Sequence, residues 1–261
     1  MDEAAKGNDM SQLVMVEQSL PGVARVTINR PAKSNALSSE LLTELITRFA
    51  TLSADAQLRA VILASAGDRA FIGGADVREM ATLDATSARS FITLIHLACK
   101  AVRDCPVPVV ARIQGHVLGA GLELAAACDL RIAADRAVFG MPEVKIGLPS
   151  VVEAALLPRL IGAGRARWLV LTGANIDAEQ ALRWGLVEQV VSPDTLDTAT
   201  NALVATLAAN APGAMRTQKR LTQLWEETPL EAAIKESIDL FAAGFAGDEP
   251  GAMLRAAAQK L

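Results

Sequence analysis

The chain has 261 residues, of which 51% are hydrophobic and 21% are charged, and its formal net charge is −4. This length and composition favour one large domain, or a domain with an appendage, around a substantial apolar core. The acidic charge and the lack of a Lys- or Arg-rich run argue against nucleic acid as the main partner, and no apolar run reaches the ~20 residues that span a bilayer.

The first elements predicted along the chain are a tail, a hairpin and a helix. Residues 1–12 (MDEAAKGNDMSQ) are polar and acidic, unlike a signal or transit peptide, so we expect a disordered tail. Strands at 13–18 and 23–29 flank Pro21-Gly22, which is a hairpin signal. Ser38 or Ser39 can cap the helix SSELLTELITRFATLSA, whose apolar residues recur at helical spacing.

The middle of the chain alternates strands with helices. AVILAS (60–65) is continuously apolar, as in a strand that is buried on both faces. The loop GDRAFIGGADVREM runs into a helix, and a longer helix, SARSFITLIHLACKAVRDC, ends before Pro106 and Pro108. A strand at 108–115 follows, and two short strands are predicted at 130–134 and 137–140.

Helical patterns dominate the chain after Glu143. They cover 151–160, 164–172 and 178–184, then one short strand (186–191) intervenes, and the final helices are predicted at 193–210, 213–226, 229–246 and near 252–260. We therefore divide the chain into a disordered tail (1–12), an α/β core (13–192) and a C-terminal helical region (193–261).

The cysteines and histidines do not suggest a metal site. The three cysteines lack CxxC spacing, and the two histidines form no ligand cluster with them. We expect buried free thiols in a cytoplasmic protein, no bound metal, and a partly buried side chain for His96, which lies on an amphipathic helix. The residues concerned are Cys99, Cys105, Cys128, His96 and His116.

The stretch 112–143 holds two carboxylates beside a Gly-rich turn. Glu123 lies in LELAAA directly after that turn, and Glu143 follows 20 residues later. Glycines allow positive φ and close approach of a ligand, and the first N–H groups of a helix can face a ligand. Apolar surroundings raise the pKa of a carboxyl group, as acid–base catalysis near neutral pH requires. The simpler alternative is that Glu123 only complements the helix dipole and the glycines only turn the chain.

A second Gly-rich turn, FIGGADVREM (71–80), also follows a buried strand and enters a helix. Two such turns can present two backbone N–H groups to one point, which is what an oxyanion hole requires. The two turns together, with Glu143 placed downstream, favour a catalytic interpretation of Glu123.

With these features the sequence resembles the enoyl-CoA hydratase/isomerase (crotonase) family over about residues 13–245. The resemblance implies an α/β fold, in which a crotonase-like spiral of ββα turns precedes a C-terminal helical trimerisation region, and a groove for a CoA thioester. It rests on NRPAKSNAL (29–37), AFIGGADVREM (70–80), IQGHVLGAGLELAAACDLRIA (113–133), FGMPEVKIGL (139–148), LTGANIDAEQALRWGLVEQVV (171–191) and Lys219.

The resemblance implies an enoyl-CoA hydratase, which adds water to a trans-2-enoyl-CoA to give a 3-hydroxyacyl-CoA. Family hydratases hold a water between two glutamates, and Glu123 and Glu143 fill both positions. We expect Glu143 to protonate C2 and Glu123 to activate the water. The backbone N–H groups of Ala75 and Ala120 would form the oxyanion hole. No cofactor is expected, because coenzyme A is part of the substrate.

The resemblance also indicates a set of substrate-binding positions. Lys33 is the expected partner of a CoA phosphate, since FAGDEPGAML lacks the basic residue that is typical there, and the alternative is an ordinary solvated lysine. The full set is Lys33, Ala36, Ala75, Asp76, Val77, Arg78, Ala120 and Ser150.

The turn after the second glutamate, GLPSVVEAALL, departs from the Gly-rich turn of family hydratases. Ser150, Val151 and Val152 replace glycines at the acyl end, and Glu153 adds a third carboxylate. Isomerisation of an enoyl-CoA, or hydration of a branched or aromatic acyl-CoA, therefore stays open. The rival of another class is a catalytically silent protein that acts in assembly or RNA binding.

The C-terminal helices predict self-association. They are rich in apolar residues although the preceding region can already fill its own core, and such surplus marks an interface. We expect a homotrimer or a dimer of trimers, with Phe241 and Phe245 on one helical face at the contact. The alternative is that these helices cover the active site of their own subunit.

Overall fold

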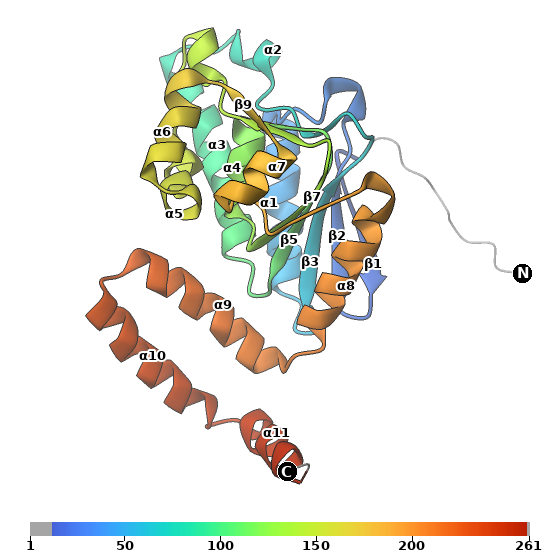
Figure 1. Ribbon diagram of the computed structural model, residues 1–261, viewed down its shortest axis with the longest axis vertical. Helices are drawn as coiled ribbons and strands as arrows, with labels where there is room; N and C mark the ends of the chain where they lie inside the picture. The colour runs from blue at the N-terminus through green and yellow to red at the C-terminus, as the bar shows by residue number, and fades with distance from the viewer. Residues whose placement is uncertain (1–11, 260–261) are drawn as a thin grey trace, which may run out of the picture.

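The computed structural model describes residues 12–259 and shows an α/β core from which the last helices extend (Figure 1). The predicted disordered tail falls, except for Gln12, outside the described residues. The first strand pair forms the predicted hairpin around Pro21-Gly22. Within residues 12–259 no helix has the length and hydropathy needed to cross a bilayer.

Within residues 12–259, ten strands form two sheets. The larger sheet has the order β1-β2-β3-β5-β7-β10, in which only β1 and β2 are antiparallel. The smaller has the order β4-β6-β8-β9, in which only β8 and β9 are antiparallel. The strands are β1 (Val14–Leu20), β2 (Val23–Ile28), β3 (Ala60–Ser65), β4 (Ala70–Ile72), β5 (Val109–Ile113), β6 (His116–Leu118), β7 (Leu130–Ala134), β8 (Val138–Gly140), β9 (Asn175–Asp177) and β10 (Gln189–Val191).

Helices connect and cover these strands. Helix α1 begins where predicted, because the Ser38 side chain accepts the N–H of Leu41 as an N-cap. The helices are α1 (Ser39–Ser53), α2 (Val77–Met80), α3 (Ala85–Arg103), α4 (Ala120–Ala127), α5 (Leu157–Ile161), α6 (Ala163–Thr172), α7 (Ala178–Trp184), α8 (Leu196–Ala208), α9 (Pro212–Glu227), α10 (Leu230–Gly244) and α11 (Asp248–Ala258), with 3-10 turns η1 (Pro31–Lys33), η2 (Glu143–Ile146), η3 (Val152–Leu156) and η4 (Pro193–Thr195).

The order of these elements confirms the predicted spiral of ββα turns. β3, β5 and β7 belong to the larger sheet, and each is followed by a strand of the smaller sheet: β4, β6 and β8. A helical segment then leads to the next turn, with α2 and α3 after β4, α4 after β6, and η2 to α6 after β8. The carboxyl ends of β4, β6 and β8 therefore bring their following loops to one side of the molecule.

Three strands were not predicted: β4, β6 and β9. Each has three residues and runs directly into a Gly-rich turn or the start of a helix, so no strand pattern stands out from the loop around it. The prediction of a single strand after Glu143 was therefore wrong, because β9 and β10 both follow that residue.

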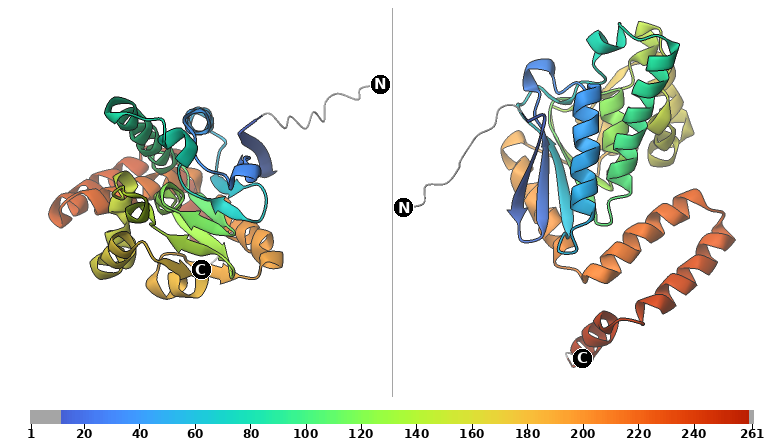
Figure 2. Two further views of the ribbon diagram at one scale, coloured as in Figure 1. Left: turned by 90° about the horizontal axis from the view of Figure 1, so that it is seen from above. Right: turned by 180° about the vertical axis from the view of Figure 1, so that it is seen from behind.

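Helix α8 covers the second face of the larger sheet. Ile62 and Ala64 of β3 pack with Leu196 and Val204 of α8, while the alternate residue Val61 faces the main core. Burial on both faces explains the continuous apolar run of β3. Helix α8, which the sequence predicts as part of the C-terminal helical region, thus packs on the sheet. Helices α9, α10 and α11 are here called the C-terminal arm. Helix α9 is bonded to the core, where the buried Lys219 donates to Asp129 and to the carbonyl of Val107, and α10 and α11 extend away from it (Figure 2).

Candidate active site

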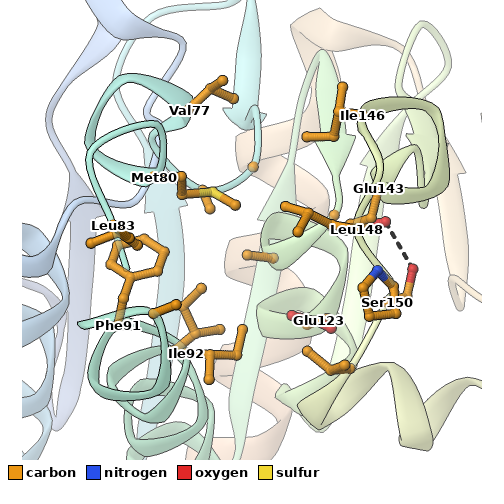
Figure 3. Close-up of a pocket in the computed structure, with 18 of the residues that line it drawn as sticks. Val77, Met80, Leu83, Phe91, Ile92, Glu123, Glu143, Ile146, Leu148 and Ser150 are labelled. Carbon is orange, nitrogen blue, oxygen red and sulfur yellow. Dashed lines mark hydrogen bonds between the residues drawn. The ribbon is translucent and has the colours of Figure 1, made fainter. Parts of the chain in front are cut away.

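A cavity of about 500 Å³ opens between α2, α3, the start of α4 and the segment that follows β8. One wall carries apolar side chains from α2, the loop after it and α3, and the opposite wall carries two glutamates (Figure 3). The apolar wall includes Val77, Met80, Leu83, Phe91 and Ile92, and the glutamates are Glu123 and Glu143.

Two backbone N–H groups at the cavity are free to bind a ligand. Ala75 lies after β4. Leu37 donates its N–H to the carbonyl of Gly74 and accepts the N–H of Asp76, so the N–H of Ala75 between them is left unused. Ala120 is the first residue of α4, so its N–H has no intrahelical partner. Among residues 12–259 neither N–H has a hydrogen-bond acceptor, and both residues line the cavity.

The turn before α4 needs glycine at position 119 for two reasons. Gly119 has φ of +52°, in the left-handed region that disfavours other residues. A Cβ atom at Gly119 would also lie 2.4 Å from Oε1 of Glu143. The second glutamate therefore packs directly against the backbone of the turn that presents Ala120.

Glu123 is a buried carboxyl group. It is 3% exposed on α4, and its Oε1 accepts the N–H of Ala154 at 3.2 Å. Burial first, and then the charges of Glu143 and Glu153, raise the pKa of Glu123 to about 8, although the hydrogen bond from Ala154 opposes the rise. Glu123 therefore holds a proton at neutral pH.

Glu143 lies at the start of η2 and is held from two sides. Its Oε2 accepts the hydroxyl of Ser150 at 2.9 Å, as the dashed line in Figure 3 marks. Its other oxygen lies against Gly119. The cavity thus pairs a carboxyl group that carries a proton with a second carboxyl group that two turns hold in place, and such a pair can act as acid and base.

The structure brings six of the ten predicted site residues to this cavity. They are Ala75, Val77, Ala120, Glu123, Glu143 and Ser150.

The other four predicted site residues lie outside the cavity lining. Lys33 is exposed on η1. Asp76 caps α2, accepting the N–H groups of Arg78 and Glu79 and a hydrogen bond from Arg30 at 2.7 Å. The carbonyl of Ala36 also accepts a hydrogen bond from Arg30, and Arg78 is exposed. Contact of these four residues with a substrate stays a prediction.

Sequence reasoning did not single out the apolar wall. Phe91, Ile92 and Ile95 of α3 line the cavity, but at helical spacing they are indistinguishable from residues that face the core. It also did not predict the contact between His96 of α3 and Glu153 of η3, in which Nδ1 and Oε1 lie 2.8 Å apart.

The chain matches known proteins over nearly its whole length. The profile of the enoyl-CoA hydratase/isomerase family matches residues 18–253. A short-chain-enoyl-CoA hydratase of Clostridium acetobutylicum is 36% identical over 228 residues, 87% of each chain. A crotonyl-CoA hydratase of Syntrophomonas wolfei is 35% identical over 225 residues, 86% of each chain. The crystal structure of an enoyl-CoA hydratase from Bacillus anthracis aligns with a TM-score of 0.92 at 33% identity, covering 95% of this chain and 97% of that one.

Proposed function

This chain belongs to the enoyl-CoA hydratase/isomerase family, and we propose that it hydrates a trans-2-enoyl-CoA to a 3-hydroxyacyl-CoA. The observation that carries this proposal is the pairing of Glu123 and Glu143 in one apolar cavity with two unused backbone N–H groups. Isomerisation of a double bond needs only one base, whereas hydration uses two carboxyl groups around a water.

The two N–H groups would bind the thioester oxygen of the substrate. When oxygen adds to C3, negative charge moves to that carbonyl oxygen, and N–H donors already fixed in place stabilise it. Ala75 and Ala120 come from separate turns of the spiral, so the fold itself determines their spacing.

The glutamate pair would move the protons. In the free enzyme the shared proton is on Glu123, because its pKa is raised to about 8. We propose that this proton passes through a bound water to Glu143, which then delivers it to C2 while Glu123 takes a proton from the water whose oxygen bonds to C3. Glu123 ends protonated and Glu143 ionised, so each turnover restores the starting state.

Crotonyl-CoA tests the proposed hydration. Water addition removes the conjugated double bond, so we expect the ultraviolet absorbance of the enoyl thioester to fall when purified protein is added. A panel of linear, branched and aromatic acyl groups then defines the acyl preference. A protein that leaves the whole panel unchanged would refute the proposed function.

We further propose that the protein assembles through its C-terminal arm as a homotrimer or a dimer of trimers. Phe241 and Phe245 of α10 are 71% and 53% exposed, with ring centroids 5.3 Å apart. An apolar groove of about 570 Å³ lies between α9 and α10. No residue of the arm lines the active-site cavity, which supports a subunit contact over a cover for the chain's own site.

The cellular location is proposed from the thiols. All three cysteines are free and buried, as in proteins of a reducing compartment. We propose a cytoplasmic enzyme.

A further inference from the structure

One short segment contacts both glutamates of the active site. The Ser150 hydroxyl donates to Glu143 at 2.9 Å, and the N–H of Ala154 donates to Glu123 at 3.2 Å. Between these two contacts Val152 has φ of +40°, which is a strained conformation for a β-branched residue. Strain of this kind persists where the surrounding structure fixes the backbone, and it is concentrated at active sites.

The residue that follows the strained position is a buried carboxylate with no part in the mechanism above. Glu153 is 6% exposed, and its Oε1 lies 2.8 Å from Nδ1 of His96, whose side chain is 46% exposed. Its Oε2 is fully buried and has no hydrogen-bond partner among residues 12–259. Burying an incompletely paired carboxylate costs stability, so its presence beside the site calls for a functional reason.

The groups that face Glu123 come from three elements. They are Glu143 from η2, Glu153 from η3 and Cys99 from α3. The Cys99 thiol stays neutral, because burial and then the charges of Glu153 and Glu123 raise its pKa well above the usual value. The strands β4 and β6 also pack on α4, but β4 has no titratable residue and His116 of β6 is exposed. Besides Glu143 and Glu153, helix α3 brings Arg89 to the lining of the same cavity and His96 to Glu153.

We propose that Glu153 is a positioning residue of this active site. Its carboxylate is held by His96 and directly precedes the Ala154 N–H that binds Glu123, so it adds a negative charge near Glu123 and, together with burial and Glu143, favours the proton on Glu123 in the free enzyme. The like charge disfavours a second anion at Glu123. The proton then stays where the catalytic cycle begins and ends. The role of Glu153 in turnover rests on the proposed function, whereas its effect on the proton does not.

A direct titration of Glu123 tests this inference. Glutamate carboxyl carbons are labelled with ¹³C and followed by NMR against pH, and the Glu123 signal is assigned by its loss in Glu123→Gln. In Glu153→Gln we expect the pKa of Glu123 to fall by about half a unit to one unit, the lower part of the range for a neighbouring charge. Glu179→Gln, which removes the same charge from an exposed side chain of α7, should leave it unchanged. An unchanged pKa in Glu153→Gln would overturn the inference.

A second variant alters the same pair from the surface. His96→Arg places a permanent positive charge next to Glu153, at a position that is half exposed. This charge should lower the pKa of Glu123 without changing a buried residue of the site. This variant decides the question if Glu153→Gln does not fold. Absence of a fall in the folded His96→Arg protein would then contradict the inference.

The kinetic readout separates the two proposals. If the wild type hydrates crotonyl-CoA, the alkaline limb of its pH profile should move to lower pH in Glu153→Gln along with the pKa of Glu123. A limb that stays in place while the pKa moves would overturn the role of Glu153 in turnover. An inactive wild type would refute the proposed function, yet the NMR titration would still report whether Glu153 holds the proton on Glu123.

Discussion

Two carboxyl groups of this molecule show how neighbouring residues decide where a proton is held. Glu123 is enclosed by α4, α3 and η3, and burial followed by the nearby anions raises its pKa to about 8. For Asp76 burial also favours the neutral acid, but the hydrogen bond from Arg30 and those from two backbone N–H groups together lower its pKa below the usual value. The first group is therefore suited to proton transfer near neutral pH, and the second serves as a charged cap of α2.

At this scale we predict that Glu123→Gln and Glu143→Gln each fold normally and lose hydratase activity by roughly 10²-fold or more, the scale of general acid–base contributions. Each amide keeps the size of the side chain but cannot act as a general acid or base near neutral pH. Initial rates with crotonyl-CoA, together with circular dichroism to verify folding, measure the effect. Near-wild-type turnover in either variant would contradict the two-glutamate mechanism.

The raised pKa of Glu123 also predicts how stability depends on pH. The pKa rises from 4.5 to about 8 on folding, so the contribution of the neutral acid is fully present below pH 4.5. It is lost as pH rises toward and through 8, because ionisation in the buried site then opposes folding. Relative to the wild type, Glu123→Gln should gain thermal stability progressively across this window. Melting curves that stay parallel from pH 4.5 to 8.5 would contradict the assigned shift.

At the scale of elements, the turn between β6 and α4 sets the distance between the unused N–H of Ala120 and the second glutamate. Gly119→Ala would place a Cβ 2.4 Å from Oε1 of Glu143 and push that carboxyl group aside. A displacement of about 1 Å can cost 10²-fold in rate, so we expect a loss of that order in kcat.

Gly147→Ala is the matched control for this turn. Gly147 also has a positive φ, +82°, but an added Cβ would meet nothing within 4 Å. Gly147→Ala should therefore lower the stability of the fold through backbone strain and keep most of the activity. Equal loss of kcat in both variants would mean that backbone strain, rather than contact with Glu143, explains the effect.

Individual helices, strands and contacts show how far the sequence can predict this structure. Helix α1 and strand β3 were predicted because a capping serine and a continuous apolar run mark them locally. Strands β4, β6 and β9 were not predicted because each is short and runs directly into a Gly-rich turn or the start of a helix. The contact between His96 and Glu153 joins residues 57 positions apart, so no local pattern could reveal it. The paired glutamates were predicted through their fixed place in two family motifs, whereas the wall formed by α3 was hidden within an ordinary amphipathic helix.

At the scale of the whole molecule, the C-terminal arm leaves an apolar surface without a partner in a single chain. The exposed positions of α10 include Leu230 at 74%, Ile238 at 64% and Phe241 at 71%. Surfaces of this kind are typical of subunit contacts, and closed symmetric assemblies are the common result.

We predict that light scattering at micromolar concentration gives three or six times the 27.4 kDa mass of one chain. Phe241→Asp should lower this mass, because a charge would be buried at the contact. Leu171→Asp is the control, since Leu171 is equally exposed, at 73%, on α6 outside the arm. A monomer mass for active wild-type protein would refute the assembly.

Isotopic water tests most directly whether the two glutamates add the elements of one water across the double bond. Crotonyl-CoA is incubated with the wild-type protein in water enriched in ¹⁸O and deuterium, and the thioester products are analysed by mass spectrometry and NMR. We expect 3-hydroxybutyryl-CoA with ¹⁸O at C3 and one deuterium at C2, and no such product from the variant that combines Glu123→Gln with Glu143→Gln. Deuterium uptake without ¹⁸O at C3, or full ¹⁸O incorporation by the double variant, would contradict it.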